Sequence, residues 1–553
     1  METTAPSPGH PAPLLLQDSP DPDAPLWERA IPAWAWHRVL GDTAAHLHGT
    51  EPDDQLWAAH DGRAHRLGPL GPHGRDLPLG PDGAEWYWVE GTGATRLEVD
   101  REATLPPVTV VMPTFRREQD ATAQAARFAA MALVARVLVI DQGGTLAEHA
   151  GFSALRAARP VVELIAQPNL GGSGGYARGM AATLETPGHA VFLGDDDAVI
   201  SEEALRRMLT AQALAPRPTV VGTGMLAAQE PSVLISHAET VGRRRFHWGP
   251  ADGMHGPLDL SGTTPADWDA LLPRHATTYS GWWGTLLPPG TVAALGLPAP
   301  YFLKWDDAEY GLRATAAGHE HLVLPGASVT HPTWDAYRTQ MTWTARVMHR
   351  NRLTTAASDG AARGVVVHSL LHQLKHVLAG HHLTARLWED GIDQFRAGPA
   401  GWLGHDLPRA RSAGQEIVEA WQGEQAPLTV GLSPTRHRPL PLVRGACRAA
   451  TRALGLTSRA PVVLALSAAD VSWRSTLGAD TVVVNNADGG RVDAWAVRGT
   501  EDRRLLRRVL RSHAGLLRSW GGLRRRYARA LPASTTPAAW ATLLPPNTTD
   551  GDR

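Results

Sequence analysis

Three consecutive carboxylates directly follow a short apolar run, and their spacing suits metal chemistry. The run Val191-Phe192-Leu193-Gly194 ends at Asp195-Asp196-Asp197. Such a run predicts a buried strand, and adjacent negative charges at its end need neutralisation. A divalent cation held against a nucleotide diphosphate would supply it, because hard oxygen ligands suit Mg²⁺ or Mn²⁺. A solvated acidic turn before a helix that starts near Ser201 is the alternative interpretation.

Strands and helices alternate upstream of these aspartates. Strands are expected at residues 108–112, 137–140 and 161–165, and helices at 118–134, 149–158 and 175–184. This alternation predicts βαβ units and a mostly parallel sheet, in which ligands bind at the carboxyl ends of the strands. A polar cluster follows each strand, which favours a nucleotide-binding protein.

The glycine-rich segment 169–177 offers a second nucleotide-binding interpretation. It contains a loose G-x-G-x-x-A pattern, which is typical of dinucleotide-binding dehydrogenases. However, the segment follows the third expected strand, and three acids stand where a single ribose-binding acid is expected. No G-K-[ST] follows, which excludes a phosphate-binding P-loop. We therefore interpret these glycines as sites of close backbone approach or positive φ.

The order of motifs resembles the galactofuranosyltransferases of glycosyltransferase family 2, and most closely those that polymerise actinobacterial cell-wall galactan. The resemblance covers the chain from about residue 100 to its end. The segments that carry it are 113–117, 141–143, 167–176, 195–197, 281–283, 304–313, His331, 349–353 and 540–545. It implies an α/β fold with a GT-A core, UDP-galactofuranose as donor and inversion at the sugar carbon. Arg116 departs from the Asn expected in the family's turn.

Inverting transfer needs a general base for the acceptor hydroxyl and positive charge on the departing pyrophosphate. Trp305-Asp306-Asp307 offers carboxylates beside an apolar side chain, which raises their basicity by desolvation. The resemblance places the base at Asp307 with Asp306 beside it. It also implies that Asp195, Asp197 and His331 bind Mn²⁺ or Mg²⁺. Simple helix capping by the acids near residue 306 is the alternative.

The resemblance also implies substrate contacts. For the nucleotide-sugar they are Thr114, Phe115, Arg117, Gln142, Asn169, Asp196 and His349. For the acceptor they are Trp282, Trp283, Glu239, Trp248 and Trp334. Aromatic faces suit the C–H faces of sugars, although a Trp pair is more often core packing and we expect at least one of Trp282 and Trp283 to pack inward. A surface basic turn is the alternative for His349.

Composition sets limits without selecting a function. The chain has 553 residues and a formal net charge of −2, so no global field favours nucleic acid. The single cysteine excludes an intrachain disulfide framework. No signal peptide or apolar run of membrane-spanning length is visible, so we expect a cytoplasmic protein. The resemblance adds an expected homo-oligomer and a glycan acceptor that a polyprenyl diphosphate could carry.

The expected domains follow changes in composition. We predict a disordered N-terminus at 1–25, a β-rich domain at 26–105, the GT-A catalytic domain at 106–345, a helical domain at 346–425 and a C-terminal region at 426–553. The last helix, about 502–530, holds ten arginines among leucines. Its apolar stripe could lie on an anionic bilayer at the inner face of the cell membrane, but packing of the stripe on the protein is favoured.

Two alternatives to this function remain open. One is a related transferase that uses another UDP-sugar. The other is a catalytically silent subunit that binds glycan or nucleotide. The presence of both a candidate base and candidate metal ligands argues against silence, because a binding module needs neither.

Overall fold

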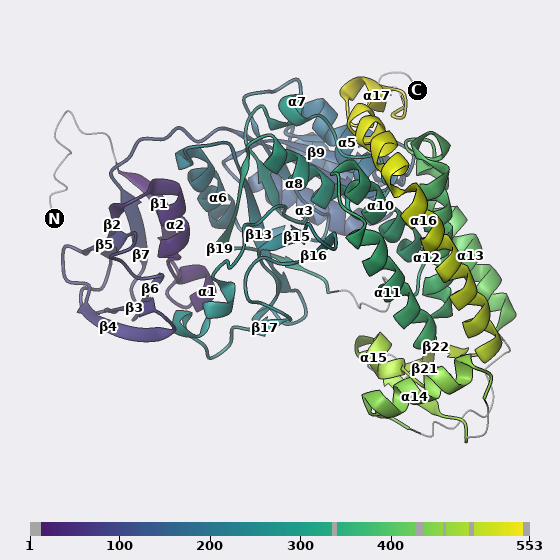
Figure 1. The fold of residues 1–553 in the computed structure, drawn as a ribbon. Coiled ribbons are helices and arrows are strands. Elements are labelled where there is room, and N and C mark those ends of the chain that lie inside the picture. Colours follow the sequence, from purple (N-terminus) through teal and green to yellow (C-terminus); the bar gives the residue numbers. More distant parts are fainter. Residues whose placement is uncertain (1–12, 334–339, 426–435, 457–459, 486–490, 546–553) are drawn as a thin grey trace.

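The computed structural model describes residues 13–333, 340–425, 436–456, 460–485 and 491–545 (Figure 1). The N-terminal part forms two antiparallel sheets, ordered β1-β7-β2-β5 and β4-β3-β6, which contribute to one core. The strands are β1 (Leu14–Ser19), β2 (Thr43–Gly49), β3 (Gln55–His60), β4 (Arg63–Pro69), β5 (Arg75–Leu79), β6 (Trp86–Glu90) and β7 (Thr95–Val99), with helices α1 (Leu26–Arg29) and α2 (Ala33–Leu40). The prediction of disorder is wrong for residues 14–19, because β1 pairs with β7.

A ten-stranded mixed sheet occupies the centre of the molecule, with the path β10-β9-β8-β11-β18-β13-β14-β17 and with β12 and β19 beside it. Its strands are β8 (Val108–Thr114), β9 (Val134–Asp141), β10 (Val162–Ala166), β11 (Ala190–Leu193), β12 (Val199–Ile200), β13 (Thr219–Ala227), β14 (Val233–Ser236), β17 (Leu258–Asp259), β18 (Thr285–Leu287) and β19 (Glu320–His331). The nearby helices are α3 (Glu118–Ala130), α4 (Ala150–Ala158), α5 (Gly171–Thr183), α6 (Glu202–Leu214), α7 (Thr291–Leu295) and α8 (Asp306–Ala316), and β15 (Glu239–Gly242) pairs with β16 (His247–Pro250) in a separate hairpin.

The parallel half of this sheet agrees with the expected βαβ units. Strands β10, β9, β8 and β11 run parallel, whereas β18 runs antiparallel to both of its neighbours. Their Val- and Ile-rich sequences fit burial on both faces. Beyond Asp197, the two residues of β12 pair with the end of β19, Val199 opposite Thr330 and Ile200 opposite Val329. This pairing places His331 beside the aspartates that follow β11.

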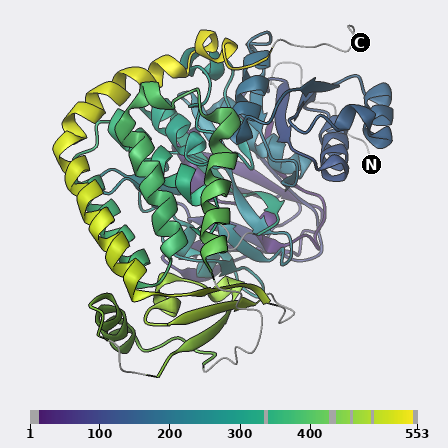
Figure 2. The same ribbon diagram turned by 90° about the vertical axis from the view of Figure 1, so that its right-hand side faces the viewer.

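Helices from the C-terminal part of the chain lie beside the central sheet (Figures 1 and 2). They are α10 (Thr344–Ser358), α11 (Gly364–Leu378), α12 (His382–Ala397), α13 (Ala410–Glu424), α16 (Gly499–Ser534) and α17 (Pro537–Ala541). The long helix α16 packs against α10, α11 and α12. It buries a stripe of apolar side chains that includes Leu505, Val509, Leu516 and Trp520. The expectation that this stripe packs on the protein is therefore confirmed, and the stripe is not free to lie on a bilayer.

A small module lies at the N-terminal end of α16 (Figure 1). It contains the sheet β20-β21-β22 and two helices. Its elements are α14 (Leu442–Ala453), β20 (Val463–Ser467), α15 (Trp473–Thr476), β21 (Thr481–Asn485) and β22 (Arg491–Ala496). Within the described ranges, no helix combines the length and apolar character that a membrane span requires.

Candidate active site

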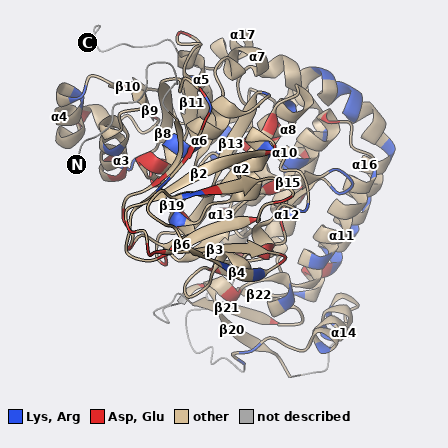
Figure 3. Cartoon of the chain, turned by 90° about the vertical axis from the view of Figure 1, so that its left-hand side faces the viewer, with Lys and Arg blue, Asp and Glu red and all other residues tan. Residues whose placement is uncertain are grey.

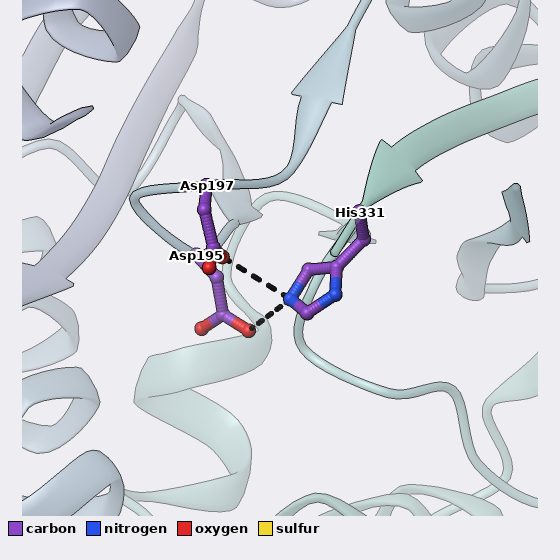
Figure 4. Close-up of side chains that lie close together, drawn as sticks. All are labelled: Asp195, Asp197 and His331. Carbon is purple, nitrogen blue, oxygen red and sulfur yellow. Dashed lines mark ion pairs between the residues drawn. The ribbon is translucent and has the colours of Figure 1, made fainter. Parts of the chain in front are cut away.

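Two aspartates and a histidine form a compact cluster at the carboxyl edge of the sheet (Figure 4). His331 Nε2 lies 3.1 Å from Asp197 Oδ1 and 3.8 Å from Asp195 Oδ2. One ligand atom from each residue lies within 4.8 Å of the other two, so a single ion can contact all three. Two carboxylate oxygens and one imidazole nitrogen suit Mn²⁺ or a similar divalent cation.

The hydrogen bonding of His331 prepares the ring for this role. Its Nδ1 lies 2.7 Å from the carbonyl oxygen of Pro332 and must donate its proton there, which directs Nε2 toward the aspartates. Burial opposes protonation of the ring, but hydrogen bonds to the two carboxylates outweigh burial and raise its pKa to about 10. A cation bound by the carboxylates would compete with that second proton, because it supplies the positive charge instead.

The middle aspartate of the triplet, Asp196, contacts Thr114 and Arg117. Thr114 Oγ1 donates to Asp196 Oδ2 at 2.6 Å, and Arg117 Nη1 lies 3.6 Å from Asp196 Oδ1. Arg117 also donates to Asp197 and Asp120. Burial raises the pKa of Asp196 to about 7. Thr114, Asp196 and Arg117 thus form one connected network at the end of β8, and Phe115 follows it with the Arg116 guanidinium 5.3 Å from its ring centre.

Tyr176 on α5 forms a hydrogen bond with one of the cluster's carboxylates, and this role was not predicted from the sequence. Its hydroxyl lies 2.7 Å from Asp195 Oδ1 and 2.9 Å from the carbonyl oxygen of Trp282. Burial, together with the charge of Asp195, raises the pKa of Tyr176 well above its ordinary value, so the hydroxyl remains a donor. The glycine-rich motif ends in this tyrosine, which is the only signal in the sequence that could have identified it.

Asp306 and Asp307 begin α8, and an unusual loop delivers them. Phe302, Lys304 and Trp305 all have positive φ, between 69° and 73°, a conformation that non-glycine residues rarely adopt. The side-chain amide of Asn351 on α10 donates to the carbonyl oxygens of Leu303 at 3.0 Å and Lys304 at 2.9 Å. Asn351 is fully buried, so these bonds hold the loop against its strain. This role of Asn351 was not predicted from the sequence.

The carboxylates near the start of α8 have raised pKa values, and burial is the largest cause for each. Burial raises the pKa of both Asp306 and Asp307, with the charge of Asp307 acting on Asp306 and that of Asp195 acting on Asp307. Burial also raises the pKa of Glu239 to about 7, with the charge of Asp307 adding to it. Asp307, Asp195 and Glu239 therefore share one electrostatic environment. Such raised basicity suits a group that must accept a proton near neutral pH.

The glycine-rich turn fits tightly against the loop that precedes α8. Gly171 has a φ of 73°, and a Cβ there would lie 2.0 Å from the carbonyl oxygen of Phe302. Gln142 braces the same turn, because its amide donates to Gly171 and accepts from the Leu170 N–H. The carbonyl oxygen and an amide N–H of Gln142 thus have partners within the protein, and its contact with the nucleotide-sugar stays a prediction. Asn169 likewise accepts from the Gly171 N–H.

The expected acceptor residues divide into three groups. Trp282 is only 6 % exposed and lies between the rings of Tyr176 and Tyr310, which confirms that at least one of the two tryptophans packs inward. Its expected contact with the acceptor stays a prediction. Trp283 is half-buried, whereas Trp248 is 44 % exposed and offers an open ring. Glu239 lies in the same hairpin as Trp248 and accepts from Ser236. Trp334 lies outside the described residues.

His349 does not face this site. It is buried between helices, where its ring stacks on Trp388 at 4.2 Å and its Nε2 lies 2.9 Å from Ser369 Oγ. Burial holds its pKa well below the ordinary value. The expectation of a phosphate contact is therefore wrong, because the histidine of the H-R-N-R segment packs into the helical core. The neighbouring Asn351 instead contacts the loop at residues 302–305, which precedes α8.

Comparisons with known proteins agree with this geometry. The family described as "Glycosyltransferase like family 2" matches residues 106–355. Galactofuranosyltransferase GlfT2 from Mycolicibacterium smegmatis is 32 % identical over 85 % of this chain and 78 % of its own. The GlfT2 of Mycobacterium tuberculosis is 32 % identical over 83 % of this chain and 78 % of its own. Among solved structures, a mannosyltransferase from Pyrobaculum calidifontis, PcManGT in complex with GDP-Man and Mn²⁺, overlaps 58 % of this chain and 84 % of its own, at 13 % identity and a TM-score of 0.34.

The fold and the site together define a glycosyltransferase with a GT-A core, an N-terminal β part and a helical C-terminal region. Within that class, the chain belongs to the GlfT2 family of galactofuranosyltransferases.

Proposed function

We propose that this enzyme transfers galactofuranose from UDP-galactofuranose to a hydroxyl of a growing cell-envelope galactan or a related glycan, with inversion and with a divalent cation. The observation that carries the proposal is the meeting of two separate sets of side chains. Asp195 and Asp197 follow β11 and His331 ends β19, while Asp307 comes from α8, and the charge of Asp195 acts on Asp307. The similarity to GlfT2 supports galactofuranose as the transferred sugar.

Asp307 is the proposed general base. It removes the proton from the acceptor hydroxyl as that oxygen forms a bond to the sugar carbon, while the bond from that carbon to UDP breaks and UDP departs with the electron pair. Its raised pKa makes it basic enough for this role near neutral pH. The charge of Asp195 adds to that basicity, and the bonds from Asn351 fix the loop that orients Asp306 and Asp307.

Asp195, Asp197 and His331 are the proposed metal ligands. The metal, when bound, neutralises charge that develops on the departing diphosphate. The nucleotide-sugar is proposed to lie at the carboxyl ends of the neighbouring strands. The residues there are Thr114, Phe115, Arg117, Asn169 and Asp196. Trp248, Trp283 and Glu239 are the proposed acceptor contacts, since an exposed indole face suits a sugar ring. A polyprenyl-linked acceptor and a homo-oligomer stay proposals drawn from the family resemblance.

The experiment is a comparison of donors. UDP release is measured from UDP-galactofuranose, UDP-galactopyranose and UDP-glucose, with a short galactofuranosyl acceptor and with either Mn²⁺ or EDTA. We expect acceptor-stimulated, metal-dependent release from UDP-galactofuranose alone. Turnover of another UDP-sugar in its place would show that the donor is wrong while transfer stands. Binding without turnover of any donor would favour the silent subunit.

A further inference from the structure

Three histidine rings meet where the β15–β16 hairpin lies beside α11 (Figure 1). His368 and His372 are one turn apart on α11, and their ring centres lie 4.4 Å from each other. The ring centre of His247, on β16, lies 5.8 Å from each of theirs. His247 is exposed and the two histidines of α11 are half-buried, so solutes can reach this histidine cluster. None of the three histidines has a place in the proposed reaction.

A buried guanidinium lies against the inner side of the histidine cluster. Arg352, on α10, is 6 % exposed, and its Nη2 lies 2.7 Å from His368 Nδ1. Its other hydrogen bonds go to the carbonyl oxygens of Arg245 and Phe246, each at 2.7 Å. Within the described residues, all of these acceptors are neutral and no carboxylate pairs with Arg352. Burial lowers the pKa of Arg352 to about 10, because no opposite charge offsets it.

Arg352 differs in this respect from five other buried arginines. A buried charge is costly unless an opposite charge compensates for it. Each of the five forms an ion pair with a carboxylate, and they are Arg207, Arg346, Arg350, Arg448 and Arg452. The uncompensated charge of Arg352 therefore indicates that a negatively charged ligand completes its surroundings.

Positive charge reaches the histidine cluster from a second side. Lys375 Nζ lies 3.5 Å from His372 Nε2 and 5.3 Å from the ring centre of Trp473 on α15. Burial, and after it the charges of Arg352 and Lys375, lowers the pKa of His368 to about 4 and that of His372 to about 3. The whole chain has 53 basic and 55 acidic residues, and Figure 3 shows both kinds spread over the sheets and the helices. The excess of positive charge at the histidine cluster is therefore local.

A metal ion fits the histidine cluster less well than an anion does. Arg352 can only donate, so the neutral His368 ring accepts at Nδ1 and carries its proton on Nε2, which then cannot bind a metal. The charges of Arg352 and Lys375 also repel a cation. Within the described parts of the chain, the one compact group of metal-type ligands is that of Asp195, Asp197 and His331.

We propose that the histidine cluster, together with Arg352 and Lys375, binds a phosphate or diphosphate group. Such a group presents several acceptor oxygens, which suit imidazole, ammonium and guanidinium donors. Within the described residues, Nη1 of Arg352 forms no hydrogen bond, so its N–H groups are available to an anion. The charge of the anion would compensate for that of Arg352 and would favour protonation of the rings.

The position of this site gives the phosphate two possible sources. The ring of His247 stacks on that of Trp248, at 5.9 Å between centres, and Trp248 is a proposed acceptor contact. The anion can therefore be an inorganic one from solution or an anionic group carried by the acceptor. The second source rests on the proposed function, whereas binding of the anion itself does not.

The test is calorimetric titration of the full-length enzyme with inorganic diphosphate and with inorganic phosphate, in EDTA so that the metal cluster contributes no ion. We expect binding that Lys375→Gln and His372→Phe each weaken at least about tenfold, because each variant removes a donor to a charged group. His372→Phe keeps an aromatic ring beside Trp388, so the fold should not change. Arg518→Gln, at an exposed position of α16, removes one positive charge elsewhere and should bind normally.

Absence of binding to both anions, or equal affinity in the Lys375→Gln and Arg518→Gln variants, would overturn the proposal. The source is decided by the KM of a galactofuranosyl acceptor with and without a terminal phosphate. A lower KM for the phosphorylated acceptor, lost in Lys375→Gln, would assign the site to the acceptor, and equal KM values would assign it to an inorganic anion. Failure of sugar transfer would leave the titration unaffected, so it would count against the proposed function alone.

Discussion

The side-chain amide nitrogen of Asn351 lies 2.9 Å from the carbonyl oxygen of Lys304, and this bond connects the helical region to the loop at residues 302–305. Lys304 and Trp305 stand in the left-handed region immediately before Asp306 and Asp307. The position of the proposed base therefore depends on a buried residue of α10 that touches no substrate-binding group. We propose that these two strained residues and the bond from Asn351 fix the carboxylate within the narrow limits that catalysis needs.

Replacement of Asn351 by Leu should lower kcat by about 100-fold, because a displacement of the order of 1 Å in a reacting group has that effect. Binding of UDP should change little, since the nucleotide contacts are proposed at the other strands. Steady-state kinetics and UDP titration measure the two effects. Thr354→Val, at a buried position of the same helix, is the control for general loosening of α10. Equal losses in the two variants would contradict a specific role for Asn351.

Removal of the Tyr176 hydroxyl should weaken metal binding. Tyr176→Phe takes away the donor 2.7 Å from Asp195 Oδ1, and the loss of such an outer contact typically costs about tenfold in metal affinity. Calorimetric titration with Mn²⁺ checks it. Tyr310→Phe is matched in size and burial, but its hydroxyl contacts none of the three cluster residues in the described structure. The same affinity in the Tyr176 variant as in the Tyr310 variant would rule out the proposed support of Asp195.

Activity should fall on the acid side at a pH above the ordinary pKa of an aspartate. The proposed base must be deprotonated, and burial raises the pKa of Asp307. Lys304→Met removes a positive charge that lowers the pKa of Asp307, so it should move the acid limb of the pH–rate profile to higher pH. The profile is measured at saturating Mn²⁺ so that metal loss does not determine it. A shift to lower pH would contradict the assigned influence of Lys304 on Asp307.

Arg452→Met should destabilise the C-terminal module by about 3–5 kcal/mol, because it leaves the carboxylate of Asp502 buried without its arginine partner. His382 remains 2.7 Å from that carboxylate and would become its main neighbour. Arg444→Met, at an exposed position on the same helix, should change the free energy of unfolding by less than about 0.5 kcal/mol. Chemical denaturation measures both, and similar values would show that Arg452 does not anchor α14.

The order of elements and the edge at which the site forms were predictable from the sequence. Hydrophobic runs that end in polar clusters identify strands of a largely parallel sheet, and the structure confirms those at β8, β9, β10 and β11. The antiparallel insertion of β18 carries no such signal, because a three-residue strand has no readable period. The proposed metal ligands follow from the family motifs, and their proximity comes from the pairing of β12 with β19.

Supporting contacts were harder to predict, since they depend on which face of a helix turns inward. His349 and Asn351 lie two residues apart in one basic segment, yet His349 packs on Trp388 and Asn351 hydrogen-bonds to the loop at residues 302–305. Trp282 and Trp283 are adjacent, and only Trp282 is enclosed by tyrosines. Helix α14 is similar: its pattern marks an amphipathic helix, but the ion pair of Arg452 with the buried Asp502 decides which face turns inward.

The most direct test of the account is a single-turnover measurement with Asp307→Asn, UDP-galactofuranose, Mn²⁺ and a galactofuranosyl acceptor. Loss of a general base typically slows the chemical step by about 10²- to 10⁴-fold. We therefore predict such a loss of sugar transfer, with Mn²⁺ and UDP binding retained because Asp307 is not among the three cluster residues. Transfer at the normal rate in this variant would contradict the assignment of Asp307 as the base.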